Sequence, residues 1–114
     1  MARDLSFWKN ERTLELGNEE IYARLSDGES IDGLADLPTD KILSEVKQVF
    51  KDWTVSDDTY FEKDEESFEL MLTKQFARFD CYSMSEDDMN KIIDIMFDHG
   101  CPLYDSAIDV RFDG

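Results

Sequence analysis

The sequence predicts a single α+β domain over residues 1–114, in which two main helices pack on one face of an antiparallel sheet of four to five strands. Three observations support this fold class. Two stretches carry apolar residues at helical spacing, several others carry them at alternate positions, and the length of 114 residues is that of one ordinary domain. Hydrophobic residues make up 41% of the chain, which is enough apolar surface to form a core despite the high charge.

The first expected element is a short strand over residues 4–9, which contain three large apolar side chains. Leu14 and Leu16 alternate with polar neighbours, so they either extend this strand or pair with it. The chain begins with no apolar run of the kind that marks a signal peptide, and no window is apolar enough to span a membrane. We therefore expect a cytoplasmic protein with reduced cysteines.

A short helix is expected next. Asn18 is a favourable N-cap, two glutamates follow it where the helix dipole favours negative charge, and Gly28 supplies a stop. A strand over residues 21–25 is the alternative for this stretch. Residues 28–37 are rich in Gly, Asp and Ser and are predicted to form a loop.

Two longer helices have the strongest signals. The stretch from Pro38 to Asp52 carries one apolar stripe, and proline is favourable at a helix start. The last helix is predicted to begin after Ser85, which forms a variant of the capping box with Asp88, and to end at Gly100. The apolar positions of these two helices are Ile42, Leu43, Val46, Val49, Phe50, Met89, Ile92, Ile93, Met96 and Phe97.

The remaining segments are predicted to be strands. Residues 53–55 and 59–61 are short candidates, and residues 68–72 and 77–81 alternate apolar with polar side chains. A final strand is expected over residues 108–112, where Ile, Val and Phe alternate with charged residues. The resulting order of elements resembles a ferredoxin-like βαββαβ plan with an added short N-terminal helix.

Charge is the most prominent feature of the composition. Asp and Glu outnumber Lys and Arg by 28 to 12, which gives a formal net charge of -16. Such a field repels nucleic-acid phosphates and anionic lipids, so we expect neither nucleic acid nor a membrane as a partner. It attracts basic proteins and speeds their encounter. The competing interpretation, with roughly even odds, is that the acidity only keeps the protein soluble.

Catalytic and metal-binding signals are weak. Cys81, His99 and Cys101 are the only soft ligands, whereas a structural zinc site usually needs four, so no metal and no cofactor are predicted. The single histidine stands in the last turn of a helix, where a C-terminal cap is a sufficient explanation. No catalytic residue is predicted, and an enzyme is the less favoured class.

Candidate partner-binding residues come from three places. The first is the acidic stretches around residues 57–65, and the second is the strand at residues 76–82, whose polar register carries two rings flanked by charge. The third is Tyr104 and Asp105 as a polar pair at the sheet edge. The favoured alternative for this segment is a turn that aims the final strand, with Tyr104 partly buried. A helix covering the face of the second group is the alternative there. The full set is Asp57, Asp58, Glu62, Asp64, Glu65, Phe76, Arg78, Asp80, Tyr82, Tyr104 and Asp105.

The favoured functional hypothesis is a small acidic module that binds a basic protein. It resembles in type, though not by any shared motif, the immunity proteins that inactivate basic toxins or nucleases. A related version is nucleic-acid mimicry, with carboxylates spaced like phosphates. The alternatives are a carboxylate-based or metal-dependent small enzyme and a structural or regulatory subunit that oligomerises through a strand face. The oligomeric state is left open.

Overall fold

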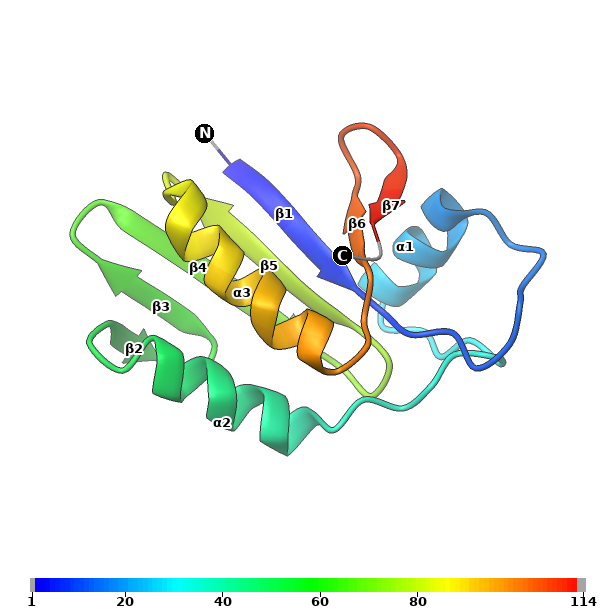
Figure 1. Cartoon of the computed structure of the whole chain (residues 1–114), viewed down its shortest axis with the longest axis horizontal. Coiled ribbons are helices and arrows are strands. Elements are labelled where there is room, and N and C mark those ends of the chain that lie inside the picture. Colours follow the sequence, from blue (N-terminus) through cyan, green and yellow to red (C-terminus); the bar gives the residue numbers. More distant parts are fainter. Residues whose placement is uncertain (1, 113–114) are drawn as a thin grey trace.

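The fold is α+β, and a computed structural model describes residues 2–112 (Figure 1). Met1, Asp113 and Gly114 of the predicted domain lie outside the described residues. The strands are β1 (Ala2–Phe7), β2 (Thr54–Ser56), β3 (Tyr60–Lys63), β4 (Glu66–Leu72), β5 (Ala77–Tyr82), β6 (Leu103–Asp105) and β7 (Val110–Phe112). The helices are α1 (Asn18–Ser26), α2 (Thr39–Val49) and α3 (Glu86–Asp98). None of these helices is both long enough and apolar enough to cross a membrane.

The strands form one antiparallel sheet in the order β2-β3-β4-β5-β1-β6-β7. The antiparallel sheet is therefore confirmed, whereas the expected four to five strands are seven, and the ferredoxin-like plan matches only in part. Six of the seven lie at or beside segments expected to be strands, whereas β6, with three residues, is too short to show a clear alternation. The segment after Pro102, expected to be a turn, is the buried strand β6.

One face of the sheet is covered by α3, which lies over β4 and β5, and by α2, which lies beside α3 on the side of β2 and β3 (Figure 1). Alternate residues of the strands point into this layer and meet the apolar stripes of both helices. The buried side chains of this core include Leu5, Phe7, Ile42, Val46, Phe50, Trp53, Phe61, Phe68, Leu70, Phe79, Cys81, Ile92, Met96 and Leu103. We call this side the closed face.

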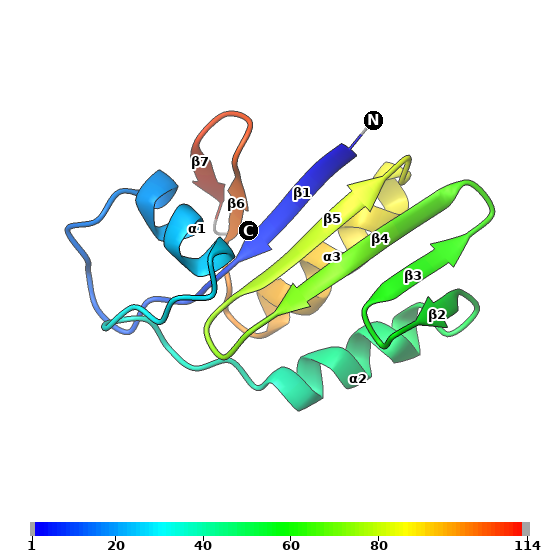
Figure 2. The same cartoon turned by 180° about the vertical axis from the view of Figure 1, so that it is seen from behind.

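The opposite face is covered only at one end, by α1 and the loop that follows it (Figure 2). Trp8, Phe76 and Tyr104 form a ring cluster there, against Ile21 and Leu25 of α1. Phe7 and Trp8 are consecutive yet belong to different cores, which shows that the direction of side chains alternates at the end of β1. This second core is the smaller of the two.

The loop over residues 28–37 is fixed to the sheet by one buried side chain. Gln75 accepts a hydrogen bond from the Ile31 N–H at 2.8 Å, and its amide nitrogen donates to the carbonyls of Ile31 at 2.9 Å and Leu34 at 3.2 Å. The amide thereby pairs the Ile31 N–H and the Leu34 carbonyl, and it adds a second donor to the Ile31 carbonyl, which also accepts from the Leu34 N–H at 3.4 Å. An irregular segment is thus held as a covering layer.

The helix ends agree with the local sequence, with one correction. Ser85 caps α3 as predicted, since its Oγ accepts from the Asp88 N–H at 3.2 Å. At α1 the N-cap is Gly17, not Asn18, and no side chain caps that end. At the other end of α3, His99 Nε2 lies 2.6 Å from Glu45 Oε2, which ties α3 to α2.

Candidate functional site

The part of the second sheet face that α1 leaves uncovered is the largest stretch of sheet without a helix over it (Figure 2). Because side chains alternate along a strand, the residues between the closed-face positions point to this side. We call this surface the open face. Its residues are Tyr60, Glu62, Ser67, Glu69, Arg78, Asp80 and Tyr82, together with Asp4 and Met71 at its border with α1.

Three carboxylates form a row across the open face. The strand register places Asp4 of β1 opposite Asp80 of β5, and Asp80 opposite Glu69 of β4. Directly opposed residues in a sheet have their Cβ atoms about 4.5–5.5 Å apart, and like charges at that spacing destabilise the pair. The row therefore stores repulsion that a single positive charge from another molecule can relieve.

The three carboxylates differ in how far the protein itself compensates them. Asp4 accepts hydrogen bonds from the hydroxyls of Tyr22 and of Ser106, the latter at 2.8 Å. Asp80 lies 3.2 Å from Nε of Arg78. Glu69 is exposed, and its carboxylate has neither a hydrogen bond nor an ion pair among the described residues. The negative charge of the row is therefore least compensated at Glu69.

Two tyrosines flank the row. Tyr60 of β3 is paired with Glu69, so it continues the row to the outer strands. Tyr82 of β5 lies in the next row, opposite Ser67, and is 42% exposed. Tyrosine beside charge at a partly exposed position is typical of residues that carry binding energy at protein interfaces.

The structure brings four of the predicted partner-binding residues together here: Glu62, Arg78, Asp80 and Tyr82. Sequence reasoning missed Asp4 and Glu69. Glu69 lies between Phe68 and Leu70, and Asp4 precedes Leu5, so the alternation indicates the face to which each side chain points. The residues opposite them across the sheet depend on strand register, which the alternation does not give.

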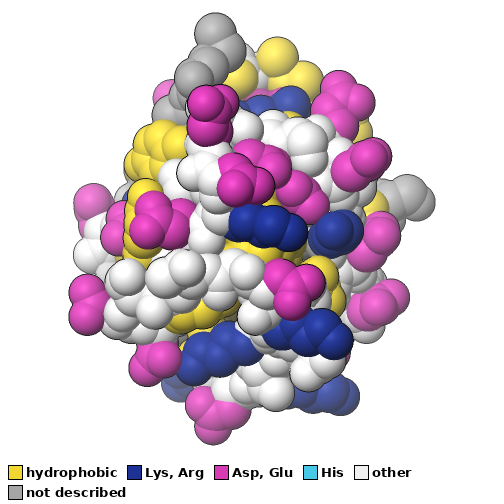
Figure 3. Space-filling model, turned by 90° about the vertical axis from the view of Figure 1, so that its left-hand side faces the viewer, with side chains coloured by type: hydrophobic (Ala, Val, Ile, Leu, Met, Phe, Trp, Pro, Cys, Tyr) yellow, Lys and Arg dark blue, Asp and Glu magenta, His cyan; other side chains and the backbone are white. Residues whose placement is uncertain are grey.

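The predicted acidic turn residues lie elsewhere. Asp57 and Asp58 form the β2–β3 turn with positive φ angles of 55° and 62°, and Asp64, at 55°, begins the β3–β4 turn beside Glu65. Asp tolerates this left-handed backbone better than most residues, which gives these positions a conformational role. Figure 3 views the end of the molecule that carries the β3–β4 turn, and acidic side chains there are interspersed with lysine and arginine.

Three predicted residues lie inside the protein and form no part of the surface. Phe76 is fully buried under α1, as the alternative of a covering helix implied. Tyr104 is 1% exposed and donates to Asp109 at 2.8 Å. Asp105 is 9% exposed and accepts from Arg3 at 3.1 Å. Both brace the β6–β7 hairpin, which corrects the expectation of an exposed polar pair.

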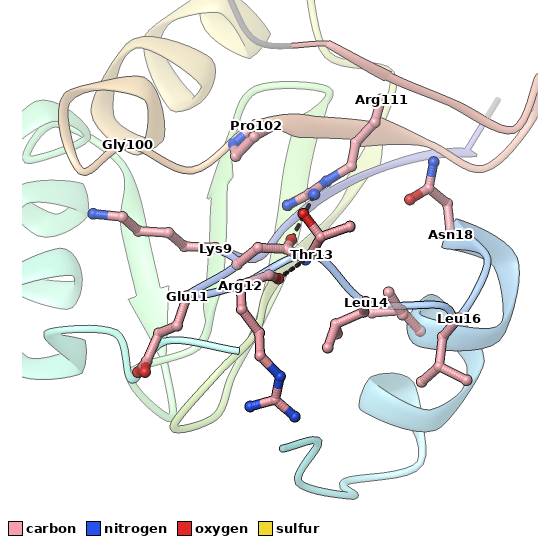
Figure 4. Close-up of a pocket in the computed structure, with 12 residues that line it drawn as sticks. Lys9, Glu11, Arg12, Thr13, Leu14, Leu16, Asn18, Gly100, Pro102 and Arg111 are labelled. Carbon is pink, nitrogen blue, oxygen red and sulfur yellow. Dashed lines mark hydrogen bonds between the residues drawn. The ribbon is translucent and has the colours of Figure 1, made fainter. Parts of the chain in front are cut away.

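A hollow of about 560 Å³ lies at the other end of the molecule, between the start of α1 and the end of α3 (Figure 4). Lys9, Arg12 and Arg111 line it, which reverses the overall sign of the charge. The three basic side chains leave its wall in different directions and do not converge on one point (Figure 4). Arg12 is also paired with Asp32 at 3.0 Å.

Arg111 has a structural explanation within this hollow. Its guanidinium lies 4.4 Å from the centre of the Trp8 ring, and it donates to Asn10 Oδ1 at 2.8 Å and to the Trp8 carbonyl. A guanidinium stacked on an indole and bonded on two sides clamps β7 to the end of β1. The hollow therefore lies where neighbouring elements pack together, and its basic side chains do not form an anion-binding site.

The soft ligands are dispersed or buried. Cys81 and Cys101 are buried free thiols, and burial raises the pKa of Cys81 to about 12. Within residues 2–112 no three His, Cys, Asp or Glu side chains are grouped so that they could hold a metal ion.

The open face is therefore the candidate site, and it is defined by charge, register and exposure alone. Comparison of the chain with protein-family models, with curated proteins and with solved structures finds no match.

Proposed function

We propose that this protein is a binding module for a basic protein, which it contacts through the open face. The observation that carries the proposal is the row of Asp4, Asp80 and Glu69 on three adjacent strands. A lysine or arginine of the partner, placed over the row, gains attraction from several carboxylates and removes their mutual repulsion. Binding energy is thereby concentrated where the sheet is exposed.

The remaining features support the same partner class. Tyr60 and Tyr82 provide flat, semi-apolar contact area on either side of the row. The net charge of -16 steers a cationic protein toward the molecule and makes its association rate depend on salt. Within this class we favour a basic toxin or nuclease, which an acidic module of the immunity type inactivates by covering its cationic site.

The test compares three forms of the protein as bait in a lysate of the source organism at low salt. The first is the wild type, and the second is the open-face variant Glu69→Gln/Asp80→Asn. The third is a control, Asp94→Asn/Asp98→Asn, which removes the same charge from exposed positions on α3. We expect the wild type and the control to capture the same basic protein, and the open-face variant to capture at least tenfold less.

Folding is monitored in parallel, because loss of capture must not reflect loss of structure. Removing like charges from neighbouring strands should raise the stability of the open-face variant by about 0.2–1 kcal/mol in urea unfolding. Equal capture by all three baits, or captured proteins with no excess of basic ones, would contradict the proposal.

A further inference from the structure

A second hollow, separate from the open face, lies at the edge of the sheet on its closed side. It has a volume of about 530 Å³ and is bounded by the end of β4, the β2–β3 turn and the first turns of α2. In Figure 2 the end of β4 runs past the start of β3, above α2. We call this hollow the edge groove.

The edge groove exposes unpaired backbone of β4. Pairing between β3 and β4 stops at Tyr60 and Glu69, and the Leu70 N–H donates to the Thr59 carbonyl at 2.8 Å. Since N–H groups along a strand point to the same edge at every second residue, the Leu72 N–H points the same way, beyond the start of β3. No described strand pairs with β4 on that side of Leu72. Further along the same edge the Leu37 N–H donates to the Lys74 carbonyl at 2.7 Å, so the open part of the edge is confined to Leu72. One residue of an extended peptide can pair with the backbone there.

The floor of the groove is apolar. Leu43 of α2 and Leu70 and Leu72 of β4 line it, and Leu43 and Leu72 are only partly buried against the core. Such a floor suits the aliphatic stem of a long side chain, which loses water along its length while its head remains at the rim.

The rim of the groove is acidic. Asp36, Asp40 and Asp58 line it, against a single basic residue, Lys74. Asp36 is paired with Lys74 at 3.6 Å, and Asp58 with Lys47 at 2.9 Å. These carboxylates are 62% and 74% exposed, so both pairs are weak surface pairs that a better-placed cation displaces. Among residues 2–112, the Asp40 carboxylate has no hydrogen-bonding or ion-pairing partner.

We infer that the edge groove binds an extended, arginine-bearing peptide segment. The backbone of the segment pairs with β4 at Leu72, an arginine stem lies over the leucines, and its guanidinium reaches Asp40. Charge complementarity selects this occupant, because an acidic or neutral segment gains nothing from the rim. Lys74, which is paired with Asp36, adds a positive charge to the rim and thereby opposes binding of the arginine.

The probe is a blocked five-residue peptide in which arginine alternates with valine, titrated into the full chain at 150 mM salt. The same peptide with citrulline in place of arginine keeps the shape and hydrogen-bonding atoms but has no charge. We expect saturable shifts of backbone amide resonances around Thr59, Leu72 and Asp40 with the arginine peptide, and much smaller shifts with the citrulline peptide.

Two variants and a control sharpen the assignment. Asp40→Asn should lower the affinity for the arginine peptide by about twofold to fivefold, which is the range for one exposed ion pair. Lys74→Ala should raise this affinity by a similar factor, and Asp94→Asn should leave the affinity unchanged. A gain of affinity in Lys74→Ala cannot result from unfolding, so this arm remains informative if Asp40→Asn is destabilised.

The inference is overturned if the arginine and citrulline peptides bind equally, if Asp40→Asn and Lys74→Ala leave the affinity unchanged, or if the shifts gather on the open face. It stands apart from the proposed function. The peptide test addresses Asp40 and Lys74, whereas the capture test addresses Glu69 and Asp80, so either proposal can fail while the other holds.

Discussion

The closed and open faces belong to the same strands but have opposite chemistry. On the closed face, Phe68 of β4 lies among four other rings, with no charged group beside it in the core. On the open face, its sequence neighbour Glu69 faces Asp80 across the sheet. Burial on one face supplies the stability that lets the other carry unfavourable charge pairs.

This division implies that stability and binding can be changed separately in this fold. A substitution on the closed face acts on the packing of α2 and α3, whereas one on the open face meets solvent. Adjacent residues of a single strand therefore provide matched tests, since they share backbone geometry and differ only in the side of the sheet.

The largest expected effect compares Phe68→Ala with Glu69→Ala. Phe68 is fully buried, and its ring centre lies 4.7 Å from that of Phe61 and 5.0 Å from that of Phe50. Its truncation should cost about 3–5 kcal/mol in the free energy of unfolding. Glu69→Ala should change it by no more than about 0.5 kcal/mol. Urea unfolding followed by circular dichroism measures both, and similar costs would break the distinction between the faces.

An intermediate effect is expected at the layer under α1. Gln75→Ala leaves the Ile31 N–H and two loop carbonyls without their buried partner, and each unsatisfied group costs about 1–3 kcal/mol. Water entering the loop recovers part of this, so we expect a total loss of about 1–3 kcal/mol.

Hydrogen exchange locates that loss. Exchange at the Ile31 amide should accelerate far more than exchange in α3, because the hydrogen bonds of the Gln75 side chain reach only the loop. Gln48→Ala, at an exposed position of α2, is the control and should alter neither measurement. Uniform acceleration across the chain would show that the small core is not a separate layer.

The smallest expected effect is a loss of stability at alkaline pH, which reports whether water is excluded from the closed face. Burial raises the pKa of Cys81 from 9.0 to about 12, so the unfolded chain loses this proton first as pH rises. The stability linked to this thiol is present below pH 9 and is lost between pH 9 and 12. The protein should be about 1 kcal/mol less stable at pH 10 than at pH 8 through this group.

The variant Cys81→Ala isolates this contribution. It should be less stable at both pH values, because a buried sulfur is removed, but its loss between pH 8 and pH 10 should be smaller. Cys101 and Tyr22, whose pKa values burial also raises, account for a remaining slope. An unchanged slope in Cys81→Ala would mean that water reaches the thiol in the folded protein.

Local patterns in the sequence were sufficient for the elements of the closed face. The stripe after Pro38 became α2, and the capping residues at Ser85 and Asp88 fixed the start of α3. The alternation around Phe68 and Phe79 became β4 and β5. Each of these signals lies within one element, so periodicity and capping alone determine it.

The open face and the second core depended on contacts between distant segments. Leu14 and Leu16 alternate like a strand, yet they pack beside α1 without forming one. Whether Phe76 is exposed was decided by α1, and the row at Asp80 was decided by register. Propensity carries no information about which strand lies next to which, so the candidate site was only partly readable.

The central position of β1 has a consequence for synthesis of the chain. This strand leaves the ribosome before its two neighbours in the sheet, β5 and β6. Until they emerge, both edges of β1 and its Leu5, Phe7 and Trp8 side chains lack their native cover. The nascent polypeptide therefore exposes an aggregation-prone segment during this interval, which makes β1 a candidate site for chaperone binding.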